Sequence, residues 1–333
     1  MKTDSIQSPD ASIGPGLAIL GMHRSGTSAL AGVFHLLGAN LGNQFIDTEP
    51  EINLKGYWEN REANHFDDRL LKFLESDWYD VLDLPHQWLE KSSEAGFDGE
   101  LAQLLKANFT GETPWVVKDP RLCRLLPFWL DVLEKQNVGV KCLIVLRHPF
   151  EVAQSLRKRD GIEMPHALLL WLRYVLDSEL SSRSTPRNVI TYENLLNDWR
   201  AVLEKAESTL DLGLGFMNDD VNQRIDAFLD RGLRHHVHSS DHVENPLLTL
   251  AISAYESLQL DDQKSLSQIR SEFRIEMKKA QPWLTQFNHV QRNFHDYRSR
   301  SEQDAKQLKK ILNSRTWRWA SPLRLLANKL KHR

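Results

Sequence analysis

Cysteine is scarce in this chain, and its scarcity argues against several classes of protein. The 333 residues include two cysteines, Cys123 and Cys142, and both lie in apolar stretches. No Cys/His spacing of the kind that binds zinc occurs in the sequence. We therefore expect both cysteines to be buried as small hydrophobic residues, in a protein of a reducing compartment.

Long apolar runs and a strong excess of one charge are also missing. No stretch approaches the roughly 20 apolar residues needed to cross a bilayer. The segment Met1–Gly14 lacks the basic and apolar parts of a secretory signal. The formal net charge is -3 at pH 7, whereas nucleic-acid-binding domains usually carry a basic excess. We therefore predict a cytoplasmic protein without a nucleic-acid partner.

Short apolar runs alternate with helical patterns over much of the chain. The runs lie at 17–21, 115–118, 141–147 and 188–192. Helical spacing follows the first run through Leu30, Val33, Phe34 and Leu37, and it recurs at 122–133, 151–159 and 166–180. Runs that are apolar on both sides are typical of buried parallel strands. The alternation predicts an α/β fold with three layers and a central parallel sheet. A glycine turn at 21–28 separates the first run from the helix that follows it, and this turn makes the predicted fold P-loop NTPase-like.

Composition divides the chain into three parts. Residues 1–15 are polar and predict a disordered leader, and residues 16–260 carry the α/β pattern. Apolar stripes run through the charged sequence of residues 261–333, and this pattern predicts a C-terminal helical extension. A coiled coil and a homodimer are both compatible with such an extension.

The end of the chain is basic. Residues 305–333 contain nine Lys/Arg and no Asp or Glu, with Trp and Leu interleaved. This pattern makes the segment a candidate for peripheral contact with an anionic membrane, which would be the inner membrane. The alternative is a basic tail that packs on its own protein.

A glycine loop follows the first predicted strand. The segment Gly21–Ser28 has the spacing of a nucleotide P-loop, but Thr27 stands where the P-loop lysine is expected. Glycines let the backbone wrap an anion, and the amides and dipole of the next helix favour negative charge. Arg24 supplies a cation that can form forked hydrogen bonds. The alternative is a glycine turn that binds nothing.

A second anion site is predicted after the third strand. Arg147 ends that run at the carboxyl edge of the sheet, where open parallel sheets bind ligands. Ser155 and Arg159 lie four residues apart, hence on one helical face. The alternative is a solvated basic helix. Two anion sites fit a nucleotide with phosphates at both ends, such as PAPS (3′-phosphoadenosine 5′-phosphosulfate).

Five ordered motifs resemble those of the PAPS-dependent sulfotransferase family, in its bacterial branch. They are Gly21–Ser28, Lys55–Glu59, Lys118–Arg121, Arg147–Ser155 and Tyr192–Leu195. The resemblance spans roughly residues 17–240 and does not cover the helical tail. It implies that residues 16–260 are a sulfotransferase domain. Such a domain would move the sulfuryl group of PAPS to a hydroxyl on a carbohydrate or small metabolite, release PAP and need no metal.

The resemblance also implies roles for individual residues. The 5′ phosphosulfate would be held by Arg24, Ser25, Gly26, Thr27 and Ser28. The 3′ phosphate would be held by Arg147, Ser155 and Arg159, with Tyr192 near the adenosine.

The expected catalytic residues are Glu59, Lys118 and Arg24. Glu59 would be the base, with Glu49, Glu51 and His65 as rivals, and its structural alternative is an ion pair with Lys55 or Arg61. Lys118 and Arg24 would stabilise charge on the leaving group, and the alternative for Lys118 is a salt bridge to Asp119 or to a neighbouring helix. The histidines His235, His236 and His238 are interpreted as surface or acceptor-contacting residues rather than a metal site.

Two other functions remain open at this stage. A P-loop kinase would need a lysine in the loop and an acidic residue after the 142–146 run, and the sequence offers neither. A non-catalytic nucleotide-binding scaffold would tolerate loss of both Lys118 and Glu59.

Overall fold

The computed structural model describes residues 13–46, 56–111, 113–213, 218–229 and 245–313. Its centre is a parallel four-stranded sheet in the order β2-β1-β3-β4. The strands are β1 (Gly16–Leu20), β2 (Trp115–Lys118), β3 (Val140–Leu146) and β4 (Arg187–Thr191). Each of the four predicted runs is therefore a strand. Side chains of β1 and β2 are buried throughout, which explains why these runs are apolar without alternation.

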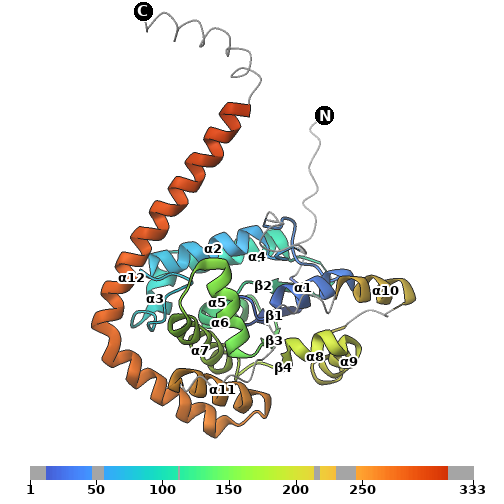
Figure 1. Cartoon of the computed structure of the whole chain (residues 1–333). Helices are drawn as coiled ribbons and strands as arrows, with labels where there is room; N and C mark the ends of the chain where they lie inside the picture. The colour runs from blue at the N-terminus through green and yellow to red at the C-terminus, as the bar shows by residue number, and fades with distance from the viewer. Residues whose placement is uncertain (1–12, 47–55, 112, 214–217, 230–244, 314–333) are drawn as a thin grey trace, which may run out of the picture. The chain divides into compact units, whose positions relative to one another are not determined.

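Helices cover both faces of this sheet, so the predicted three-layer α/β fold is confirmed (Figure 1). One face packs in a common core with α1 (Thr27–Leu36), α8 (Tyr192–Asn197), α9 (Trp199–Leu210) and α10 (Asp219–Phe228). The other face contacts α5 (Leu122–Lys135), α7 (Met164–Ser181) and α11 (Pro246–Gln259), with α6 (Pro149–Asp160) packed on α7.

Three helices lie between α1 and β2, in a segment for which the sequence pattern predicted no element. They are α2 (Arg61–Phe73), α3 (Trp88–Glu94) and α4 (Phe97–Asn108). Phe66 of α2 contacts the rings of Phe97, Phe128 and Trp129, so an aromatic cluster joins α2 to α4 and α5. This cluster fixes α2, whose first residues reach the site described below.

The C-terminal helix α12 (Gln263–Asn313) is continuous over 51 residues and runs through Pro282. Two compact units divide the chain, Met1–Arg274 and Ile275–Arg333. Within the second unit, Trp283, Val290 and Tyr297 recur every seven residues and are exposed. The spacing is compatible with a coiled coil, which stays a prediction, as do the domain boundaries drawn from composition.

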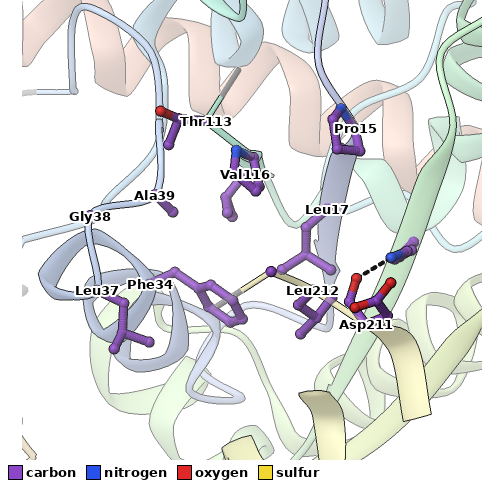
Figure 2. A pocket seen from close by; sticks show the side chains of 14 residues that line it. Pro15, Leu17, Phe34, Leu37, Gly38, Ala39, Thr113, Val116, Asp211 and Leu212 are labelled. Carbon is purple, nitrogen blue, oxygen red and sulfur yellow. Dashed lines mark hydrogen bonds between the residues drawn. The ribbon is translucent and has the colours of Figure 1, made fainter. Parts of the chain in front are cut away.

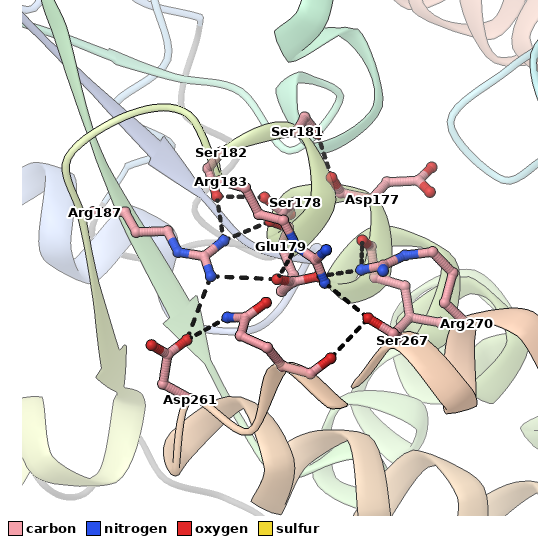
Figure 3. Close-up of polar contacts among 12 residues, drawn as sticks. Asp177, Ser178, Glu179, Ser181, Ser182, Arg183, Arg187, Asp261, Ser267 and Arg270 are labelled. Carbon is pink, nitrogen blue, oxygen red and sulfur yellow. Dashed lines mark hydrogen bonds and ion pairs between the residues drawn. The ribbon is translucent and has the colours of Figure 1, made fainter. Parts of the chain in front are cut away.

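Within the first unit, a buried glutamate joins the start of α12 to α7 and β4 (Figure 3). The Glu179 carboxylate on α7 accepts a hydrogen bond from Arg183 at 2.7 Å and pairs with Arg187 of β4 at 3.2 Å. Arg270 of α12 donates to the same carboxylate. Burial opposes ionisation of Glu179, but the contacts with Arg183 and Arg270 outweigh it, so its pKa lies below the usual value.

Several other expectations can be placed on this fold. Cys123 and Cys142 are both buried and free, as expected. Among the described helices, none has the length and apolar character that a bilayer crossing requires. Outside the described residues lie Glu49, Glu51, Lys55, the histidines at 235, 236 and 238, most of the leader, and residues 314–333 of the basic end.

Candidate active site

The carboxyl ends of the four strands gather the predicted site residues at one edge of the sheet. Lys118 ends β2, Gly21 follows β1, Arg147 follows β3 and Tyr192 follows β4. After β1 the chain enters α1 on one face, and after β3 it enters α6 on the other. The crevice between β1 and β3 is thus a topological switch point, where open α/β sheets bind ligands.

The glycine loop is a tight turn built on left-handed backbone. Gly26 has φ 95° and caps α1, and Arg24 has φ 69°, which is strained for a residue with a side chain. A Cβ at Gly26 would lie 2.2 Å from Cδ2 of Tyr192. The Tyr192 ring therefore closes directly over the loop, and only glycine fits beneath it.

Two polar side-chain atoms of this loop are buried without a hydrogen-bond partner. They are Oγ of Ser25 and Nε2 of His23. A buried polar atom without a partner costs about 1–3 kcal/mol, so both atoms fit a site that is completed by a ligand. His23 was absent from the predicted set, although its place inside the 21–28 motif was the available signal.

Several cationic side chains surround the loop, and their effects are felt by His23 and Arg24. Burial, followed by repulsion from Arg159, Arg121, Lys118 and Arg24, holds the pKa of His23 well below its usual value. Burial also lowers the pKa of Arg24, and the cations of Arg159 and Arg147 lower it further. An anion bound among these groups would relieve their repulsion. The loop is therefore electrostatically suited to a ligand with negative charge.

The two predicted anion sites are joined in the structure. Nε of Arg24 donates to Oγ of Ser155 at 2.9 Å, and Nη1 of Arg147 donates to the carbonyl of Arg24 at 3.1 Å. Arg147 also pairs with the buried Glu151 at 2.8 Å, and its guanidinium lies 5.0 Å from the centroid of the Tyr192 ring. Since 131 residues separate Arg24 from Ser155, sequence spacing could not reveal this contact.

Arg159 lies beside the same site but has a different partner. Its Nε donates to both carboxylate oxygens of Asp160, at 2.8 and 2.7 Å. Its guanidinium lies 5.9 Å from the centroid of the Trp78 ring. The structure thus holds Arg159 near the cations of the loop through Asp160.

The predicted catalytic residues Lys118 and Glu59 form a buried ion pair. Nζ of Lys118 also donates to Oγ of Ser28 and to the carbonyl of Tyr57, both at 3.1 Å. The pair is therefore linked to the glycine loop through Ser28. Trp58, next to Glu59, has a left-handed φ of 54°, so a second strained residue lies at this edge.

The structure also places the residues that were alternative partners or rivals of Glu59 and Lys118. Arg61 donates to the carbonyl of Phe45 at 3.0 Å. Asp119 accepts from Arg121 rather than from Lys118. His65, a rival for the base, is exposed on α2.

A separate pocket of about 310 Å³ opens at the opposite, amino edge of the sheet (Figure 2). Leu17, Phe34 and Val116 give it a largely apolar lining, and Lys141 at its rim donates to the carbonyl of Asp211. None of its lining residues belongs to the predicted site.

Comparison with known proteins gives weak similarities. No protein-family model matches the chain, and no curated protein sequence matches it. Among solved structures, the sulfotransferase domain of a Synechococcus olefin synthase is 19% identical with a TM-score of 0.39, covering 76% of this chain and 97% of that chain. The sulfotransferase domain of the curacin biosynthetic pathway is 16% identical with a TM-score of 0.38, covering 78% and 98%.

A sulfotransferase from Mycobacterium tuberculosis is 13% identical with a TM-score of 0.36, covering 74% of this chain and 77% of that chain. Similarities at this level do not show an activity for this chain.

Proposed function

We propose that this protein is a sulfotransferase that moves the sulfuryl group of PAPS to an acceptor hydroxyl on a carbohydrate or small metabolite, without a metal ion. The observation that carries the proposal is the glycine loop at the β1–β3 switch point. Its Ser25 hydroxyl is buried without a partner among several cations. The five ordered motifs support the same reading, because they occur in the order typical of PAPS-dependent sulfotransferases.

The residues present fit a donor with phosphates at both ends. In the proposal, the loop amides and the side chains of Arg24 to Ser28 hold the 5′ phosphosulfate. Arg147, Ser155 and Arg159 hold the 3′ phosphate, and Tyr192 lies beside the adenosine. The hydrogen bond between Arg24 and Ser155 supports this division, because it puts the two groups within reach of one nucleotide.

Catalysis would consist mainly of positioning and charge stabilisation. The acceptor oxygen forms a bond to sulfur while the bond from sulfur to the phosphate oxygen breaks, which yields a sulfate ester and PAP. Glu59 takes the proton of the acceptor hydroxyl. Lys118 and Arg24 donate to the oxygen on which negative charge develops.

The Lys118–Glu59 pair suits this division of labour. Each residue neutralises the other while both are buried, so neither leaves an isolated charge in the protein interior. When Glu59 becomes protonated, Lys118 keeps its charge for the leaving phosphate. Ser28 keeps Lys118 next to the loop that would hold that phosphate.

Turnover of PAPS tests the proposal directly. The purified chain is incubated with PAPS and a panel of sugars, nucleotide sugars and phenols, with EDTA present, and PAP release is measured. PAP release above the enzyme-free rate, lost in Lys118→Met, is the expected result. Magnesium-dependent turnover of ATP without turnover of PAPS would replace the proposal by a kinase.

The proposal keeps the domain layout predicted from composition. Residues 16–260 form the sulfotransferase domain of a cytoplasmic enzyme, and residues 261–333 form a helical tail. Contact of residues 305–333 with an anionic membrane, and pairing of two copies through the tail, stay predictions from the sequence.

A further inference from the structure

Behind the Lys118–Glu59 pair, one asparagine joins two carboxylates. Nδ2 of Asn64 donates to Oε2 of Glu59 at 3.0 Å and to Oδ2 of Asp119 at 3.0 Å. The other oxygen of Glu59 pairs with Lys118, which directly precedes Asp119 at the end of β2. The four residues therefore form a closed ring of contacts, which we call the Glu59 ring.

Only a donor group can occupy the place of the Asn64 amide nitrogen. An NH₂ group carries two hydrogens, one for each carboxylate, whereas an amide oxygen there would face two acceptors and be repelled by both. The orientation of the Asn64 amide is thus fixed by its partners. In turn, the amide fixes the rotation of the Glu59 carboxylate.

The start of α2 places both side chains. Asn60 caps the helix, since its side chain accepts a hydrogen bond from the amide of Ala63 at 2.9 Å. Glu59 lies immediately before this cap. Asn64 lies one turn into the helix, where its backbone N–H donates to the carbonyl of Asn60 at 3.0 Å. The helix cap therefore sets the distance between Glu59 and Asn64.

Asp119 is an anchor fixed by its hydrogen bonds. Burial raises the pKa of its carboxyl group, and the Arg121 guanidinium opposes that rise. Asp119 is 1% exposed, and its carboxylate accepts hydrogen bonds from Nη1 of Arg121 at 3.1 and 3.2 Å and from the Arg121 amide at 2.8 Å. Both of its oxygens therefore accept donors, with Asn64 completing the set. A carboxylate fixed on every side is a firm point for Asn64 to bind.

Asp67 lies on the same helix as Asn64, and its carboxyl group is buried close to the ring. It is 0% exposed, accepts from Nε1 of Trp129 at 2.8 Å, and its second oxygen has no partner. Burial first, and then repulsion from Asp119, raises the pKa of Asp67 well above its usual value. Glu59 pairs with Lys118, and Asp119 pairs with Arg121.

We infer that Asn64 is a positioning residue for sulfuryl transfer: it ties Glu59 to Asp119, so that Glu59 keeps its orientation toward the acceptor hydroxyl. The inference rests on the proposed function, in which Glu59 is the base. During transfer Lys118 must stabilise the leaving phosphate and can no longer orient Glu59. The hydrogen bond from Asn64 then keeps Glu59 oriented. A misplaced catalytic group can lower the rate by about 10²-fold, which sets the size of the expected effect.

The test varies the number of hydrogens that residue 64 can donate. Asn64 offers two and Asn64→Ser offers one. An ionised Asn64→Asp offers none at nearly the same volume as the original side chain, and it also adds a negative charge between Glu59 and Asp119. PAP release from PAPS is measured under saturating donor, with water as the acceptor when no other substrate has been found, and the Kd for PAP is measured by calorimetry. We expect turnover to fall about 10²-fold in Asn64→Asp, and by an intermediate factor in Asn64→Ser. The Kd for PAP should stay within about twofold, because Asn64 makes no contact with the glycine loop among its hydrogen bonds in the structure.

Asn43→Asp is the matched control, because it makes the same chemical change at an exposed side chain that donates only to a backbone carbonyl. It should leave both turnover and the Kd for PAP unchanged. Unchanged PAP binding also shows that an inactive variant is folded.

The outcomes separate the two levels of the proposal. Turnover in Asn64→Asp that equals turnover in the unaltered protein overturns the positioning role alone. An unaltered protein that never releases PAP from PAPS overturns sulfuryl transfer itself, and the role of Asn64 with it.

Discussion

Replacing Gly26 by alanine tests the packing of the Tyr192 ring over the glycine loop. Gly38 provides a matched control. It follows the end of α1, whose start Gly26 caps, and its φ of 89° is similar to the 95° of Gly26. A Cβ added at Gly38 would lie in open space. A left-handed φ strains alanine, whereas alanine lowers the conformational entropy of the unfolded chain and so favours folding. Together the two effects lower the free energy of unfolding by about 1 kcal/mol at both positions. At Gly26 alone, the new methyl group would lie 2.2 Å from Cδ2 and 2.8 Å from Cε2 and Cγ of Tyr192.

Overpacking of this kind costs about 1–3 kcal/mol, so Gly26→Ala should lose that much more free energy of unfolding than Gly38→Ala. Urea denaturation of both variants measures the difference. Because the guanidinium of Arg147 lies over the displaced ring, Gly26→Ala should also weaken PAP binding, and Gly38→Ala should not. Equal losses of stability in the two variants, within about 0.5 kcal/mol, would refute the close contact of ring and loop.

Two further predictions concern buried carboxyl groups. Glu179→Gln leaves three arginines facing a neutral amide, and removal of one partner from a buried ion pair costs about 3–5 kcal/mol. Chemical denaturation at pH 7 should show that the free energy of unfolding falls by this order. An unchanged free energy of unfolding would contradict the role of Glu179 in holding α12. Since the pKa of Glu179 is lowered by folding, its contribution is present above the pKa of an unfolded glutamate and is lost as pH falls through the folded value. Asp67 has the opposite sign: folding raises its pKa, so its favourable contribution is lost as pH rises through the folded value. Asp67→Asn should therefore stabilise the protein more at pH 8 than at pH 5, and a pH-independent effect in denaturation curves would show that Asp67 is ionised.

The elements that the sequence predicted well are those whose pattern is local. Apolar runs without alternation identified all four strands, because both faces of the sheet are covered by helices. The turn at 21–28 was recognisable because its glycines stand where left-handed backbone is needed, as at Gly26. The order of the strands follows from pairings between distant segments and had to come from the structure.

Contacts within the site were beyond the reach of the sequence for the same reason. The motifs indicated that Arg24, Ser155, Glu59 and Lys118 bind or react, but spacing does not show which of them touch. Fifty-nine residues separate Glu59 from Lys118, and their pairing depends on the helix cap of α2. Asn64 carries no motif of its own, so only its place between two carboxylates draws attention to it.

The most direct test of the account is calorimetric titration with PAP, with and without magnesium and beside ATP. Arg147→Ala is compared with Arg157→Ala, which removes an exposed arginine of α6, the helix that begins just after Arg147. The account predicts PAP binding that does not depend on magnesium, is lost in Arg147→Ala and is retained in Arg157→Ala. Absence of PAP binding by the unaltered protein, or magnesium-dependent binding of ATP in its place, would contradict it.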